Sequence, residues 1–272
     1  MKSVTVTAAD GGAAPTEVLI GRTITLKASA VYGDDSPVET PTVVWASSKP
    51  DVATVADGVV TGKTAGSTVI TATVDDVTSP DLTVTVAPVP VETVRITSTV
   101  NQGVEGTDVT LTAEVTPDDA TDKTLTWESS MPEVAAFTKT GAPAGGKILS
   151  LLKKGETTVT VHAGDQSATL DVTVLGLDSL TVTATARQGG QTLAVKEPVG
   201  TDLQRRYRIT GADAKPAVAY DTVCATADGW LAWPENGEVS GTEGQIATVV
   251  DMTTKGANAR GKGETTLPAP LA

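Results

Sequence analysis

The feature that most constrains this chain is a tryptophan-centred phrase that occurs twice. The first copy, WASSKPDVA, runs from Trp45 to Ala53, and the second, WESSMPEVA, runs from Trp127 to Ala135. The spacing of the two tryptophans is about the length of one small β-sandwich, so the repeat predicts tandem domains. Arrays of such domains usually extend and display rather than catalyse.

The residues around each copy alternate as β-strands do and are separated by turns. From Thr23 to Ala28, polar residues alternate with apolar ones, which predicts a strand with one face in the core. Gly21 and the pair Asp57-Gly58 mark tight turns. We therefore predict an all-β protein with three tandem sandwich domains at 1–87, 88–175 and 176–272.

The second domain repeats the order of the first with one insertion. The segment from Thr140 to Lys147 is rich in glycine and lengthens the connection after the second tryptophan, which predicts a longer hairpin. The third domain opens with a similar alternation from Leu180 to Ala186 but lacks the tryptophan phrase. We expect a divergent β-rich domain there.

Charge and cysteine content argue against several classes of partner. The net charge is −13, whereas nucleic acids and anionic membranes attract clustered basic residues. Cys224 is the only cysteine, so the domains are expected to fold without an internal disulfide. No apolar run approaches the ~18 residues of a membrane span. The strand-like start at Val4 lacks the apolar region of a signal peptide, so we expect either no secretion or a leader already removed.

Several segments of the two repeats resemble the bacterial immunoglobulin-like domain, group 2. These segments are Gly21–Leu26, Trp45–Ala53, Asp57–Thr61 and Ala65–Ile70 in the first copy, and Gly106–Leu111, Trp127–Ala135 and Lys154–Val159 in the second. Lys154 departs from the family's alanine, and the insert replaces the family's glycine hairpin. The resemblance implies immunoglobulin-like sandwiches in an exposed role. Family members occur in bacterial adhesins, cell-wall enzymes and phage virion proteins, so no single activity is implied.

The third domain is similar over a short stretch to terminal segments of phage head-fibre and decoration proteins. The similarity lies in the phrase Gly241–Val250 and in the lysine- and glycine-rich hairpin Lys255–Gly263 that follows it. It implies a domain that docks on a virus particle.

The tryptophans fall into two pairs with different expectations. Trp45 and Trp127 are expected in the cores, because large aromatic rings bury much apolar area and these domains have few others. Trp230 and Trp233 have two interpretations. They either form the core of the third domain or make a candidate interface that stacks on a protein or a sugar.

Arg205, Arg206 and Arg208 form the one basic cluster of this acidic chain. One interpretation is a charged strand edge that blocks aggregation. The other is a candidate interface for an acidic partner such as a capsid lattice. The sequence leaves both open.

No catalytic, cofactor or metal site is predicted. His162 is the sole histidine and alternates with valines, so its side chain is expected to point outward. No motif for nucleophilic or zinc catalysis is present. Cys224 is expected to be a small buried residue. The acidic pairs supply too few oxygens for calcium and are expected in solvated turns; they are Asp34-Asp35, Asp75-Asp76 and Asp118-Asp119.

The sequence favours a non-enzymatic bacteriophage virion accessory protein: a capsid decoration, head-fibre or tail protein. Its third domain would dock on the major capsid protein, and the repeats would offer weak adhesion to host-surface glycans or proteins in many copies, including as a homo-oligomer. Two alternatives stay open: a secreted bacterial adhesin or cell-wall surface fragment, and a spacer of a larger extracellular enzyme. The location is the virion in the first case and the extracellular space or bacterial cell surface in the others. No cofactor, nucleic acid or membrane insertion is expected.

Overall fold

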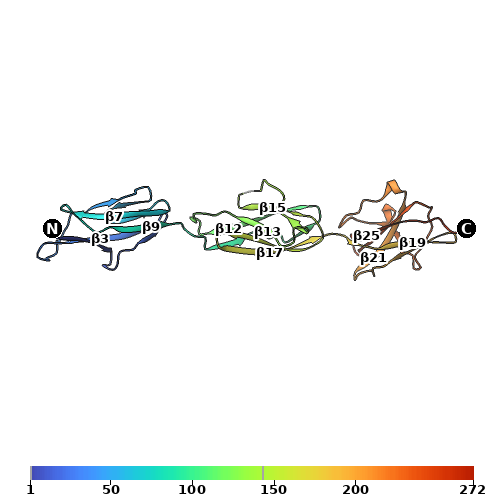
Figure 1. Cartoon of the computed structure of the whole chain (residues 1–272). Coiled ribbons are helices and arrows are strands. Elements are labelled where there is room, and N and C mark those ends of the chain that lie inside the picture. Colours follow the sequence, from blue (N-terminus) through green and yellow to red (C-terminus); the bar gives the residue numbers. More distant parts are fainter. Residues whose placement is uncertain (1, 143) are drawn as a thin grey trace. The chain divides into compact units, whose positions relative to one another are not determined.

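The computed structural model describes residues 2–142 and 144–272 as β-strands joined by turns (Figure 1). The helical elements in this part of the chain are two 3-10 turns, η1 (Ala212–Ala214) and η2 (Thr226–Asp228). Neither has the length or apolar character that a membrane crossing requires, and the same holds for any helix in the described residues. The all-β prediction is confirmed. Met1, in the predicted first domain, and Pro143, in the insert, lie outside the described residues.

By its internal contacts the chain divides into two compact units. One comprises 1–95, 114–126 and 162–167, and the other comprises 96–113, 127–161 and 168–272. This division cuts the second sandwich, so the boundaries predicted at 87 and 175 stay predictions. Each sandwich is described by itself below.

The first sandwich contains two sheets. In order across one sheet, the strands are β1 (Ser3–Ala8), β3 (Thr23–Val31), β6 (Val59–Gly62) and β5 (Ala53–Ala56). Across the other they are β2 (Glu17–Leu19), β9 (Leu82–Ala87), β7 (Gly66–Val74) and β4 (Val44–Ser47), and β8 (Val77–Thr78) pairs with β7. β3 shows the predicted alternation, with Leu26 buried between exposed Thr25 and Lys27. Leu26 packs in a core with Val60 and Ile70.

The predicted turn at Asp57-Gly58 joins β5 to β6. Both residues have positive φ angles, 50° and 82°, as the type I′ turn of a two-residue hairpin requires. A Cβ atom at Gly58 would lie 2.5 Å from the carbonyl oxygen of Leu26, so the close approach of two backbones also requires glycine here.

The second sandwich has the same strand order. In order across one sheet, the strands are β10 (Thr93–Ile96), β12 (Asp108–Thr116), β15 (Gly146–Leu151) and β14 (Ala135–Ala136). Across the other they are β11 (Gln102–Val104), β17 (Gln166–Leu175), β16 (Gly155–Ala163) and β13 (Thr126–Ser129). The insert lies in the connection between β14 and β15, which pair as a hairpin. Leu111, Leu149 and Val159 pack in its core.

The third sandwich has a five-stranded and a three-stranded sheet. In order across the larger sheet, the strands are β18 (Asp178–Ser179), β25 (Ala259–Thr266), β24 (Ile246–Thr253), β21 (Leu203–Thr210) and β22 (Leu231–Ala232). Across the smaller sheet they are β19 (Val182–Arg187), β20 (Gly190–Val195) and β23 (Glu238–Val239). Every residue of β24 from Ile246 to Met252 is buried. Ala247 packs against Leu193 of the smaller sheet, whereas Val250 packs against Trp230 of the long connection between β21 and β22. The larger sheet is therefore covered on both faces.

Candidate functional site

The serine pair of the tryptophan phrase is explained by one buried threonine in each repeat. In the first repeat, the Thr68 hydroxyl oxygen lies 2.9 Å from the Ser47 hydroxyl and 3.2 Å from the Ser48 hydroxyl. The same oxygen accepts a hydrogen bond from the backbone N–H of Lys49 at 3.0 Å. We call this arrangement the threonine node.

The second repeat has the same threonine node at Thr157. Its hydroxyl lies 2.8 Å from the Ser129 hydroxyl and 3.2 Å from the Ser130 hydroxyl, and it accepts from the backbone N–H of Met131 at 3.1 Å. The large majority of buried polar side-chain atoms in proteins are hydrogen-bonded. The repeated phrase therefore serves the fold, and its serines are engaged internally rather than free for chemistry.

The repeat tryptophans lie against the cores. Trp45 is partly buried and packs against both core clusters of the first sandwich. Trp127 is partly buried as well and packs against the second core, where its ring centroid lies 5.7 Å from that of Phe137. Neither indole is a free stacking platform.

Arg205 is buried, which corrects its interpretation as an exposed interface residue. Its side chain is 8% exposed, and that of Asp251 on the adjacent strand is 5% exposed. Arg205 donates from Nε to Oδ1 of Asp251 at 2.7 Å and from Nη2 to Oδ2 at 2.8 Å, and also to the backbone oxygen of Glu197 at 2.9 Å. A buried charge requires such pairing, so Arg205 is a structural residue of the third domain.

The other two arginines lie on a strand whose outer edge is only partly covered. β22 pairs with Arg206 and Tyr207 of β21, so the interpretation as an exposed strand edge does not hold for Arg206. Arg206 donates from Nη1 to the backbone oxygen of Cys224 at 2.9 Å and thereby holds the covering connection. Arg208 is half-buried beside Gly229 and stays a candidate interface residue.

Trp230 and Trp233 differ in their surroundings. Trp230 is 3% exposed and packs against Cys224, Val250 and Met252, which places it in the core. Trp233 is half-buried and meets Tyr207 edge-on, with ring centroids 6.3 Å apart. Of the two tryptophans, Trp233 therefore stays the candidate interface residue.

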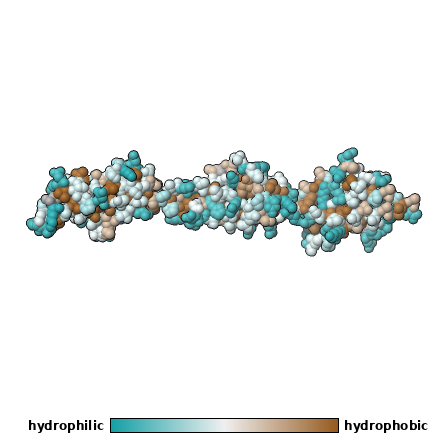
Figure 2. Space-filling view, in the orientation of Figure 1, coloured by the Kyte–Doolittle hydropathy of each residue, from teal (hydrophilic) through white to brown (hydrophobic). Residues whose placement is uncertain are grey.

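An exposed apolar residue lies on the edge strand β22, just before Trp233. Leu231 pairs with Tyr207 of β21 and is 51% exposed. The backbone N–H of Trp233 continues this pairing by donating to the Arg205 oxygen at 3.2 Å. On the face that Figure 2 shows, apolar residues lie between hydrophilic ones in all three sandwiches. We call Leu231, Ala232 and Trp233 the β22 edge.

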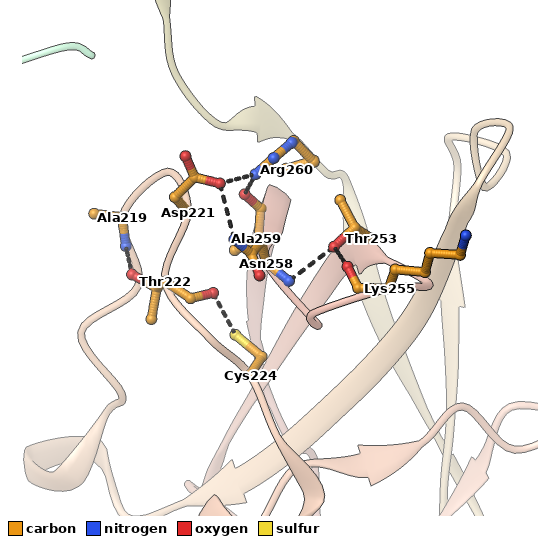
Figure 3. Close-up of polar contacts among 9 residues, drawn as sticks. All are labelled: Ala219, Asp221, Thr222, Cys224, Thr253, Lys255, Asn258, Ala259 and Arg260. Carbon is orange, nitrogen blue, oxygen red and sulfur yellow. Dashed lines mark hydrogen bonds and ion pairs between the residues drawn. The ribbon is translucent and has the colours of Figure 1, made fainter.

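A polar cluster fastens the covering connection to β25. The Asp221 carboxylate accepts hydrogen bonds from Arg260 Nη1 at 2.6 Å and Asn258 Nδ2 at 3.2 Å (Figure 3). The Arg260 guanidinium also lies 4.4 Å from the ring centroid of Tyr220. The hydrogen bond from Arg260 lowers the pKa of Asp221, and Asn258 adds to this effect. The cluster holds the loop over the sheet.

The other residues considered in the sequence analysis lie in the core, in turns or within a strand. Cys224 is buried, and burial raises the pKa of its thiol, which disfavours the reactive thiolate. Asp35, Asp75 and Asp76 have positive φ angles typical of turns. In the described part of the chain, no three His, Cys, Asp or Glu side chains lie together as metal ligands would. His162 lies between two buried residues of β16.

A shallow polar groove lies on the second sandwich. Its volume is about 430 Å³, and Glu156, Thr158 and Asp171 line it together with neighbouring serine and threonine residues. Thr158 donates to Asp171 Oδ1 at 2.7 Å, so part of its hydrogen-bonding capacity is already used. The residues that line the groove offer hydrogen bonds, and none of them is aromatic.

The sequence model of the bacterial Ig-like domain (group 2) matches residues 1–86 and again 90–174. The chain belongs to this family. The two suspected tandem copies are thereby confirmed, and the threonine node is a feature of both group 2 domains. The third sandwich lies outside the matched residues. A search of the curated proteins finds no match.

Solved structures similar to this group 2 chain include an S-layer protein and two bacterial adhesins. Domains 7, 8 and 9 of the S-layer protein SbsC are 15% identical over 99% of each chain, with a TM-score of 0.36. The Yersinia pseudotuberculosis adhesin InvE is 15% identical over 68% of this chain and 67% of its own, with a TM-score of 0.34. The Escherichia coli adhesin FdeC is 18% identical over 98% and 96%, with a TM-score of 0.30. Longer SbsC fragments are covered over 39% to 48% of their length. At these identities the likeness concerns the fold alone.

Sequence reasoning missed three structural residues of the domain outside the family match. Asp251 interrupts an apolar run, and an acid in a buried strand signals a basic partner. Gln191 is fully buried and bonds Gly241 at both its backbone N–H and oxygen. No local pattern marks Gln191 or the Asp221 cluster, because their partners are distant in sequence.

Proposed function

We propose that this chain is a non-enzymatic segment of a bacterial surface protein, in which two group 2 domains act as spacers and the third domain binds a partner. The observation that supports this most directly is the β22 edge. It combines an exposed leucine on a two-residue edge strand with the half-buried tryptophan that directly follows this strand, in the domain outside the family match. Tryptophan, tyrosine and arginine side chains at the centre of a contact usually supply most of its affinity.

The group 2 domains support the spacer role by their construction. Their motif residues are used internally by the threonine node and the tryptophan packing. The net charge of −13 opposes close association of copies and favours an extended, solvated display. The proposed partner is a surface protein or glycan, and the proposed location is the extracellular face of a bacterium.

The virion location is the second candidate, and it depends on the phrase from Gly241 to Val250. In the structure this phrase leads into β24, whose residues from Ile246 to Val250 are buried. Core packing therefore accounts for much of the pattern that resembled a docking segment. For this reason we prefer the cell surface to the capsid.

The test is binding of the labelled full chain to intact bacteria and, in parallel, to purified phage particles. Leu231→Ser should weaken binding to bacteria several-fold, because it removes apolar area from the β22 edge. The matched control is Leu152→Ser, which changes a leucine of the second domain that is 46% exposed. Equal binding by both variants would overturn the role of the β22 edge. Binding to particles but not to bacteria would favour the virion.

A further inference from the structure

We infer that each domain is built to bear tension along the chain, through a pair of parallel strands near its two ends. In the first domain, β2 near the start pairs in parallel with β9 at the end. In the second, β11 pairs in parallel with β17, and in the third, β18 with β25. We call each of these pairs a terminal clamp.

The terminal clamp of the first domain extends beyond the paired residues. The backbone N–H of Thr85 donates to the Thr16 oxygen at 2.8 Å, and that of Ile20 donates to the Ala87 oxygen at 3.0 Å. These bonds flank the pairing of Val18 with Val86, both of which are buried. Water therefore has poor access to the centre of the clamp.

The second domain repeats these contacts at equivalent positions. The backbone N–H of Thr173 donates to the Asn101 oxygen at 2.9 Å, and that of Glu105 donates to the Leu175 oxygen at 2.8 Å. The same backbone geometry thus occurs in two domains whose sequences differ at most of these positions. The clamp is a property of the fold rather than of one sequence.

The parallel direction decides how the clamp responds to force. The chain enters a clamp at the N-terminal end of one strand and leaves at the C-terminal end of the other. In a parallel pair these two points lie at opposite ends of the ladder, so tension slides the strands past each other and loads all bonds together. In an antiparallel hairpin the two points would lie at the same end, and the bonds would open one after another.

In the first domain, the strand that precedes the clamp is not part of it. β1 precedes β2 and pairs with β3 in the other sheet, so its release leaves the β2–β9 clamp intact. Resistance to force depends on the unfolding barrier rather than on equilibrium stability. The clamps therefore provide mechanical strength separately from the cores.

The third domain has the shortest clamp. Only Asp178 and Ser179 of β18 pair with β25, and Leu180 adds one bond from its N–H to the Lys262 oxygen at 2.9 Å. After β25, the chain adds an isolated parallel bridge, between Gln188 and Leu271. The first two clamps each pair three residues on either side. The third domain should therefore unfold at the lowest force.

The experiment stretches the full chain between its two ends and records the force of each unfolding event, assigned by the length of chain released. In the unaltered protein, the event of the third domain should have the lowest force. This order requires no variant, and a third domain that unfolds last would overturn the inference.

A proline variant tests the first clamp directly. Thr85→Pro removes the N–H that bonds Thr16, and the force peak of the first domain should fall by roughly a third or more as the ring disrupts the ladder. The control is Thr83→Pro in the same strand, because Thr83 lies before the parallel pairing begins. Thr173→Pro makes the equivalent change in the second domain.

A core variant separates mechanical from thermal stability. Val60→Ala lowers the melting temperature by removing buried methyl groups but leaves the clamp intact, so its unfolding force should change little. A folded Thr85→Pro protein with unaltered force, or a Val60→Ala protein with an equal loss of force, would overturn the inference. The inference extends the proposed function without depending on it, since binding to bacteria is measured separately.

Discussion

The buried polar residues of the two repeats are serines and threonines, whereas the third domain also buries an ion pair and a glutamine amide. Thr68 and Thr157 each gather two serine hydroxyls and a backbone N–H. The third domain buries the Arg205–Asp251 ion pair and Gln191. Each arrangement satisfies its polar atoms, but the effects of removing one partner should differ.

The difference follows from the free energy of leaving a polar atom unpaired. An unpaired buried hydroxyl or N–H costs about 1–3 kcal/mol, whereas breaking a buried ion pair costs about 3–5 kcal/mol. The repeats are therefore expected to tolerate changes at their nodes better than the third domain tolerates changes at its ion pair.

The largest effect is expected from Asp251→Ala. It leaves the Arg205 guanidinium buried without its carboxylate, so the third domain should lose about 3–5 kcal/mol of unfolding free energy. The measurement is denaturant unfolding of the full chain. The double variant Arg205→Met with Asp251→Leu should recover much of the loss. If Asp251→Ala alone leaves the unfolding of this domain unaltered, the ion pair does not stabilise it.

The next effect is expected from Trp45→Ala and Trp127→Ala. Each should destabilise its own domain by about 3 kcal/mol, near the lower end for tryptophan truncation because both side chains are only partly buried. Thermal melting of the full chain measures this, with the third domain as an internal reference. An unchanged melting curve would show that the indoles do not support the cores.

A smaller effect should follow from changes at the threonine nodes. Thr68→Val removes the acceptor of the Lys49 N–H and should cost about 1–3 kcal/mol, and Thr157→Val should cost a similar amount in the second domain. Thr68→Ser keeps the hydroxyl and is the control. The comparison with the ion pair fails if Thr68→Val destabilises as strongly as Asp251→Ala.

The smallest effect concerns pH. The pKa of Asp221 is lowered by Arg260, and that of Glu197 is lowered by hydrogen bonds from Thr181. A lowered pKa in the folded state stabilises the protein above the ordinary carboxyl pKa, and this stability is lost as pH falls through the folded value. The melting temperature of the third domain should therefore fall below about pH 4. Asp221→Asn should reduce this slope, and an unchanged slope would contradict the assignment.

The repeats were largely predictable from sequence, whereas the contacts of the third domain were not. Alternation predicted β3, and the Asp57-Gly58 pair predicted the β5–β6 hairpin, because both signals act between neighbouring residues. The arginine cluster was misinterpreted because exposure was inferred from charge. Arg205 finds its carboxylate on β24, far along the chain, and no local pattern reports that pairing.

By itself the sequence determined that the chain is all-β, that two group 2 domains follow each other, and where the hairpins turn, since strand alternation and turn chemistry are local properties. Only the tertiary structure decided that Trp230 is buried and Trp233 is not, that Arg205 is internal, and that the two strands of each terminal clamp run parallel. These features depend on which distant strands become neighbours. The register of a sheet is set by the packing of its whole face and not by any one segment.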